Sequence, residues 1–245
     1  MEKRAEPLLK DDEMPQLFGI IVAIFIIILT IVLFIVWQRK KSVGRSVLIT
    51  GLCDAGKTLL YARLVHLRFI ETYTSAKENI GDIEIKENAL RIVDIPGHER
   101  LRYKFFDKYK SSVRGLIYVI DSVTFQKDIR DVAEFFYTLL CDSAVRKSLP
   151  ILVLCNKQDQ TLAKSSTVIR NLLEKELNLV RLTKSSQLEA TDASSNNTFL
   201  GKEGKDFQFD DLNLNLEFAE CSAFSKDSET SADIEQLQDW LERIA

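Results

Sequence analysis

The segment SVLITGLCDAGKTLLYARLVHL, residues 46–67, joins a β-branched apolar run to a glycine-flanked loop and then to leucines at helical spacing. The loop matches the pattern G-x-x-x-x-G-K-[ST], which requires a strand before it and a helix after it. Backbone N–H groups and a lysine can bind phosphate oxygens, and the hydroxyl at the last position can coordinate Mg²⁺. The segment therefore predicts an α/β sheet with a nucleoside triphosphate site. We expect the phosphates to contact Gly51, Leu52, Cys53, Asp54, Ala55, Gly56, Lys57 and Thr58, before a helix with Leu60, Leu64 and Leu67 on its inner face.

A second apolar strand, within ALRIVDIPGHE at residues 89–99, ends in Asp94. A carboxylate at such a strand end can hold Mg²⁺ through water, and the N–H of Gly97 can reach a γ-phosphate. A D-I-P-G string alone is an ordinary turn, but its position after the phosphate loop favours the site.

The base is predicted to lie against PILVLCNKQD, residues 150–159, a buried strand that ends in N-K-x-D. The Asp159 carboxylate can accept from the N1–H and N2–H donors of guanine, whereas adenine has no such pair. Lys157 can lie over the base, and Asn156 can tie this segment to the phosphate loop. A last strand, Leu214–Ala219, brings backbone N–H groups of Cys221, Ser222 and Ala223 toward guanine O6.

Composition excludes several classes of protein. The formal net charge is −3 over 245 residues with both signs mixed, so no direct binding to nucleic acid is expected. The four cysteines, Cys53, Cys141, Cys155 and Cys221, are far apart and form no C-x-x-C pair. This spacing favours free thiols in a reducing compartment over disulfides or a zinc site.

The run LFGIIVAIFIIILTIVLFIVW, Leu17–Trp37, carries no charge and is long enough for a bilayer core of about 30 Å. Its length, its acidic upstream flank and the lack of a small-residue cleavage site disfavour a signal peptide. A basic stretch, QRKKSVGR at 38–45, follows it, and the positive-inside rule places the C-terminal side in the cytosol. We therefore predict a lumenal tail at 1–16, a single span at 17–37 and a cytosolic domain at 46–245.

In this order, GLCDAGKT, DIPGHE, NKQD and ECSA resemble the small GTPases, and NKQD is most similar to the ADP-ribosylation-factor branch. With the span directly before the domain, residues 17–245 resemble the β subunits of signal recognition particle receptors. Further matching stretches include HERLRYKFFDKYKSS and LGKEGKDFQF.

The resemblance implies a P-loop small-GTPase fold, a mostly parallel six-stranded sheet flanked by helices. It implies GTP and Mg²⁺ as ligands and the receptor's α subunit as partner in a heterodimer. It also implies a single-pass protein of the endoplasmic reticulum membrane, with any contact to ribosome or translocon indirect.

Further elements follow from pattern. A hairpin turning near Glu87-Asn88 is the one antiparallel pair expected, and Gly115–Asp121 is a core strand. Residues 183–215 are too polar and too long for an ordinary connection, and their first half has a disordered composition. Their second half, DFQFDDLNLNLEF, alternates and should rejoin the sheet. Helices are expected at Asp128–Cys141, Lys164–Asn178 and Ala232–Ile244, the last with Ile234, Leu237, Leu241 and Ile244 facing the core.

Small GTPases keep their first switch where this chain has FIETYTSAKENIG, residues 69–81. A threonine there should hold Mg²⁺ only when a γ-phosphate is present. Thr72 and Thr74 both qualify, and the distance to the next strand favours Thr74.

The sequence leaves the roles of two residues, His98 and Cys53, in GTP hydrolysis open. His98 stands where many small GTPases have a glutamine, so it either positions the attacking water or only packs beside the switch. Cys53 stands where many relatives have glycine and would crowd the γ-phosphate. No motif places an arginine finger, so unaided hydrolysis should be slow.

Three function classes fit the sequence. The first is a GTP-dependent receptor subunit whose nucleotide state controls a partner. The second is a vesicle-coat GTPase, disfavoured because such proteins use reversible anchors. The third is a membrane anchor in which the nucleotide is only structural.

Overall fold

The central strand of the sheet is built from the apolar run that opens the phosphate-loop segment. In the computed structural model, which describes residues 21–34, 44–86, 88–146, 149–189, 200–202, 204–225 and 232–245, strand β1 is Ser46–Thr50. Val47, Leu48 and Ile49 have no exposed surface there. β1 pairs in parallel with a strand on each side, which explains why its sequence is continuously apolar.

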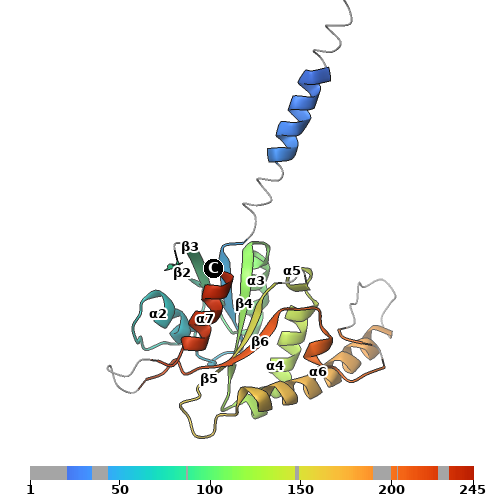
Figure 1. Cartoon of the computed structure of the whole chain (residues 1–245). Coiled ribbons are helices and arrows are strands. Elements are labelled where there is room, and N and C mark those ends of the chain that lie inside the picture. The colour runs from blue at the N-terminus through green and yellow to red at the C-terminus, as the bar shows by residue number, and fades with distance from the viewer. Residues whose placement is uncertain are drawn as a thin grey trace, which may run out of the picture. The chain divides into compact units, whose positions relative to one another are not determined.

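The sheet has six strands in the order β2-β3-β1-β4-β5-β6 (Figure 1). β2 is antiparallel to β3, and the other neighbouring pairs are parallel. The predicted mostly parallel six-stranded sheet with one antiparallel hairpin is therefore confirmed, although Glu87 in its turn lies outside the described residues. The remaining strands are β2 (Asn79–Ile85), β3 (Asn88–Asp94), β4 (Val113–Asp121), β5 (Ile151–Asn156) and β6 (Leu216–Glu220).

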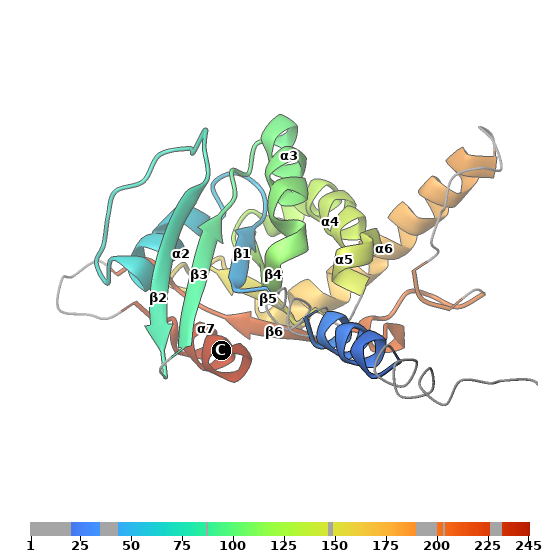
Figure 2. The same ribbon diagram turned by 90° about the horizontal axis from the view of Figure 1, so that it is seen from above.

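Helices cover both faces of the sheet (Figure 2). One apolar cluster joins α2 (Lys57–Val65) and α7 (Glu235–Ile244) to the face that carries Val47 and Ile49. The other cluster joins α3 (Glu99–Tyr109), α4 (Phe125–Cys141), the short α5 (Ser143–Arg146) and α6 (Ser166–Glu189) to the face that carries Leu48. Alternation of the strand side chains thus supplies two cores, as expected for a doubly covered sheet.

Several predicted boundaries are wrong. α2 ends at Val65, and Leu67, predicted on its inner face, is 80% exposed with a φ of 54°. α7 begins at Glu235, three residues after the predicted Ala232, and β6 begins at Leu216 rather than Leu214. In each case the apolar pattern continues beyond the hydrogen-bonded element.

The largest correction concerns the polar insertion. α6 runs to Glu189 instead of ending near Asn178, so residues 183–189 are helical. The alternating stretch DFQFDDLNLNLEF, residues 206–218, rejoins the sheet as predicted, but only from Leu216, and Phe209–Asp211 within it forms a 3₁₀ turn. Before Leu216 the alternation serves packing, because the buried rings of Phe207 and Phe209 lie edge to face with their centroids 5.2 Å apart. Residues 190–199 lie outside the described part of the chain.

The N-terminal unit is described at residues 21–34, which are helical with exposed apolar side chains. Among the residues described, there is no helix of the length and hydropathy needed to cross a bilayer. The predicted span, Leu17–Trp37, extends past this described stretch on both sides. The predicted tail, 1–16, and most of the linker, 38–45, lie outside the described residues.

Candidate nucleotide-binding site

The loop between β1 and α2 adopts backbone angles that its glycines permit. Gly51 has a φ of 141° and Gly56 a φ of 89°, both in the region that favours glycine. A Cβ at Gly51 would lie 2.2 Å from the carbonyl oxygen of Val119, and one at Gly56 would lie 2.3 Å from the Asn156 amide. Larger residues would therefore push the loop away from β4 and from the N-K-x-D segment.

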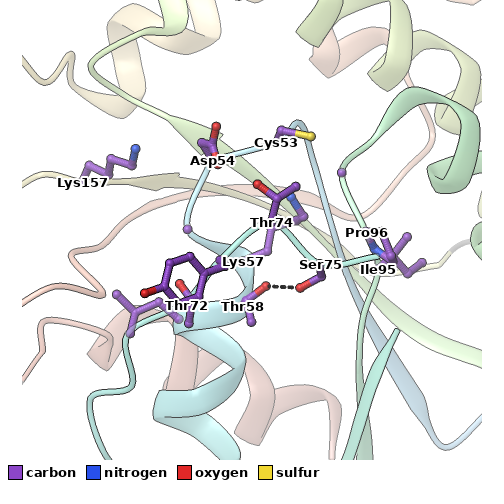
Figure 3. A pocket seen from close by; sticks show the side chains of 14 residues that line it. Cys53, Asp54, Lys57, Thr58, Thr72, Thr74, Ser75, Ile95, Pro96 and Lys157 are labelled. Atoms are coloured by element: carbon purple, nitrogen blue, oxygen red, sulfur yellow. Dashed lines mark hydrogen bonds between the residues drawn. The ribbon is translucent and has the colours of Figure 1, made fainter. Parts of the chain in front are cut away.

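A pocket of about 260 Å³ opens beside this loop (Figure 3). Lys57, Thr58, Thr74 and Ser75 gather near the middle of the view, with Lys157 on one side and Ile95 and Pro96 on the other. Segments far apart in sequence thus converge on one cavity. Its lining consists of Cys53, Asp54, Gly56, Lys57, Thr58, Leu59, Thr72, Tyr73, Thr74, Ser75, Ile95, Pro96, Gly97 and Lys157.

The Lys57 ammonium brings a buried positive charge to the pocket. The side chain donates to the carbonyl of Leu52. Burial lowers the pKa of Lys57, while the nearby Asp94 carboxylate acts in the opposite direction. An anion such as a phosphate would stabilise the charged lysine in this buried position.

Thr58 lines the pocket and is hydrogen-bonded to Asp94, which is not among the lining residues. The Thr58 hydroxyl donates to Asp94 Oδ2 at 2.8 Å and lies 3.2 Å from Ser75 Oγ. Asn79 donates to the same carboxylate oxygen at 2.9 Å. Asp94 Oδ1 is buried and finds no hydrogen-bond partner within the described part of the chain. Burial raises the pKa of Asp94, so a cation beside this carboxylate would stabilise its charged form.

The first-switch segment supplies a hydroxyl that the sequence analysis missed. Thr72 and Thr74 both line the pocket, but the hydroxyl in contact with Thr58 belongs to Ser75. Ser75 could have been considered from the sequence, because it directly follows Thr74, the preferred threonine. The choice between the two threonines as a ligand remains a prediction.

The N-K-x-D segment is fastened to its neighbours by hydrogen bonds. Asn156 donates to the carbonyl of Ala55 at 2.9 Å, which is the predicted tie to the phosphate loop. Asp159 Oδ1 accepts from the Ser222 hydroxyl at 2.7 Å. Lys157, predicted to lie over the base, lines the pocket, whereas Asn156 and Asp159 do not, so the predicted contact of Asp159 with guanine lies outside its volume.

Lys157 is positioned by Asp121, which the sequence analysis placed on a core strand without assigning it a role. Lys157 has a φ of 70° and donates to Asp121 Oδ2 at 2.7 Å. Burial would raise the pKa of Asp121, but hydrogen bonds from Lys157 and from the Val123 N–H outweigh it and lower that pKa. Asp121 could have been found from the sequence, because it ends the parallel strand that precedes the N-K-x-D strand in the chain and pairs with it in the sheet.

The backbone N–H groups of the segment after β6, which were predicted to face guanine O6, already donate hydrogen bonds within the protein. The N–H of Cys221 donates to the backbone carbonyl of Cys155, and that of Ser222 donates to the backbone carbonyl of Asp233. The N–H of Ala223 donates to Asn156 Oδ1 at 3.1 Å. A guanine O6 would have to share the Ala223 N–H with Asn156, or use a donor beyond these three residues.

Gly97 and His98 differ in their relation to the pocket. A Cβ at Gly97 would lie 2.6 Å from Cys53 N and 2.7 Å from Lys57 Nζ, so only glycine allows this approach. His98 is exposed, precedes the first turn of α3, and its Nδ1 accepts from the Arg100 N–H at 3.3 Å. The imidazole therefore caps a helix here and is not part of the pocket lining.

Comparisons with known proteins agree with this arrangement. A family model described as the signal recognition particle receptor beta subunit matches residues 42–216. The signal recognition particle receptor subunit beta of Rattus norvegicus is 44% identical over 238 residues, covering 94% of this chain and 88% of the relative. The solved mammalian SRP receptor has 43% identity and a TM-score of 0.71, covering 82% of this chain and all of that one. An SRb-GTP/SRX complex from Chaetomium thermophilum shares the fold at 18% identity and a TM-score of 0.63, covering 81% of this chain and 97% of that one.

Proposed function

Because the chain belongs to the family of signal recognition particle receptor β subunits, we propose that it binds GTP and anchors the receptor's peripheral α subunit to a membrane. The observation that carries this proposal is the pocket itself. The phosphate loop, both switch segments and Lys157 line one cavity, so one nucleotide can contact all of them. The membrane in this proposal is that of the endoplasmic reticulum, which the resemblance to signal recognition particle receptor β subunits supports.

Each part of the nucleotide has candidate partners in this proposal. Residues 51–58 hold the phosphates, with Lys57 and the helix N-terminus of α2 supplying positive charge. Asp159 recognises guanine, and Asn156 keeps its segment on the phosphate loop. Mg²⁺, when bound, neutralises phosphate charge. The Thr58 hydroxyl, Thr74 and Asp94 would hold it, the last through the Oδ1 atom that has no partner among the described residues.

The switch function follows from the two segments that line the pocket opposite the loop. Thr72–Ser75 and Ile95–Gly97 both border the space beside Lys57. A γ-phosphate would fix both segments, and its loss would release them. The partner then recognises the fixed arrangement. In keeping with this, one structural neighbour, the SRb-GTP/SRX complex, combines GTP and SRX in a single assembly.

Measuring α-subunit binding with GTP, with GDP and without nucleotide tests the function directly. The proposal expects binding with GTP and at least about tenfold weaker binding in the other two states, a difference of about 1.4 kcal/mol. Equal binding in all three would favour the anchor with a structural nucleotide. Release of the whole chain from membranes on hydrolysis would favour the vesicle-coat class.

Membrane topology gives a separate prediction. In sealed microsomes, protease added from outside should digest the domain 46–245 and spare the tail 1–16, because the basic flank 38–45 retains the C-terminal side in the cytosol. Detergent before protease is the control and should expose both. Protection of the large domain in sealed vesicles would contradict the predicted orientation. That result would not bear on the proposed nucleotide site.

Slow hydrolysis is a further prediction. The purified protein should retain GTP through many minutes, because His98 caps α3 outside the pocket lining and Cys53 lines the pocket where the γ-phosphate is expected. Single-turnover hydrolysis measures this rate, and His98→Ala should change it little without a partner. The same variant should lose about 1 kcal/mol of stability through the missing cap. Rapid hydrolysis that His98→Ala abolishes would instead establish His98 as a water-positioning residue.

A further inference from the structure

Arg63 connects α2 to the segment after β6, although the sequence analysis gave it no role. Its Nε donates to the carbonyl of Ala223 at 3.1 Å, and its Nη2 donates to Ser225 Oγ at 3.1 Å. Arg63 lies on the helix that begins with Lys57 and Thr58. The guanidinium therefore joins the predicted base segment to the helix that carries the phosphate ligands.

The same guanidinium contacts the beginning of the first switch. Its central carbon lies 5.6 Å from the centroid of the Phe69 ring. Leu67, with a φ of 54°, redirects the chain after α2 toward this contact. The Phe69 ring in turn meets Phe224 edge to face, with centroids 5.8 Å apart. Arg63, Phe69 and Phe224 thus form one cluster, which we name the Arg63 cluster.

Ala223 is consequently held on two sides. Asn156 accepts from its N–H and also bonds to Ala55 in the phosphate loop. Arg63 donates to its carbonyl from α2. The base segment is therefore tied to the phosphate-binding unit twice, once through the N-K-x-D strand and once through the Arg63 cluster. The tie through the Arg63 cluster also includes Phe69, the first residue of the first-switch segment.

We propose that Arg63 is a positioning residue that couples the base segment to the entry of the first switch and slows nucleotide release. The inference rests on the proposed function, since it concerns the same guanine nucleotide. In this proposal, release of the base requires movement of the segment around Ala223, and Arg63 opposes that movement through two hydrogen bonds and a cation–π contact. Because GDP and GTP carry the same base, the coupling acts on both.

Release of fluorescent GDP and GTP analogues from the detergent-solubilised full chain tests the proposal. Arg63→Met keeps the aliphatic stem but removes the donors, and should speed release about tenfold for both nucleotides. Arg63→Lys keeps the charge and one possible donor position, and should restore part of the slow release. The matched control is Arg68→Met, an exposed arginine just beyond the same helix, which should release at the wild-type rate.

A double-mutant cycle separates coupling from simple loss of stability. Phe69→Leu should also speed release, and its effect should be smaller in the Arg63→Met background because the contact is already lost. Wild-type release from Arg63→Met, or strictly additive effects of the two changes, would overturn the inference. Failure of the wild-type chain to bind any guanine nucleotide would instead overturn the proposed function.

Discussion

Asp159→Asn is expected to lower the affinity for GTP by about a thousandfold while giving the protein measurable affinity for xanthosine triphosphate. The carboxylate can accept from both guanine donors, and an amide can accept from only one of them. The lost charge-assisted hydrogen bond, at about 1.5–3 kcal/mol, and the unpaired guanine donor that then faces the amide N–H₂, at about 1–3 kcal/mol, together account for a loss of this size. Xanthine carries an oxygen in place of the exocyclic amine, so the new amide can donate to it.

The surroundings of Asp159 make this a selective test. Its Oδ1 accepts from Ser222, and an asparagine oxygen can keep that bond, so the segment should stay folded. Asp210→Asn makes the same chemical change on an exposed side chain paired with Arg170 and should leave both affinities unchanged. Titration of each variant with both nucleotides measures the exchange of specificity. Unchanged GTP affinity in Asp159→Asn would remove the base assignment.

How much the sequence could predict depends on whether a feature is local. The phosphate loop and the core strands were predictable, because glycines at 51 and 56 and continuous apolar runs are local features of the sequence. Asp94 and Asn156 were predictable from their places at strand ends. Their bonds to Thr58 and Ala55 are consequences of parallel strands ending at one edge.

The misses were long-range contacts. Asp121, Ser75 and Arg63 are ordinary residues in sequence, and their roles arise only when β4, the first-switch segment and α2 come together. His98 was left open between water positioning and packing, and the structure adds a helix-capping hydrogen bond from the Arg100 N–H that neither alternative had named. The alternation at residues 206–218 indicated a return to the sheet, which begins only at Leu216, because Phe207 and Phe209 earlier in the stretch pack in the core instead.

Thr58→Asn should produce the largest effect on the partner. The variant loses the hydroxyl that donates to Asp94 and that is proposed to face Mg²⁺. Asp94 Oδ2 then keeps the hydrogen bond from Asn79, and the larger amide enters the space beside Ser75. Loss of these contacts to a charged group should weaken GTP binding about a hundredfold and leave both switch segments unfixed. We expect the α subunit to be absent from material purified through this variant.

Two further variants separate the switch from the anchor. Thr58→Ser keeps the hydroxyl and is the matched control, so it should retain GTP and partner near wild-type levels. A chain lacking residues 17–37 should keep the partner and lose the membrane, because the pocket and the switch segments lie entirely within the second unit, Gly44–Ala245. Co-purification with the α subunit, together with the bound nucleotide measured by chromatography, reads out all three chains. If Thr58→Asn protein free of GTP still retains its partner at the wild-type level, the interaction does not depend on the switch, and the nucleotide serves the structure of the anchor alone.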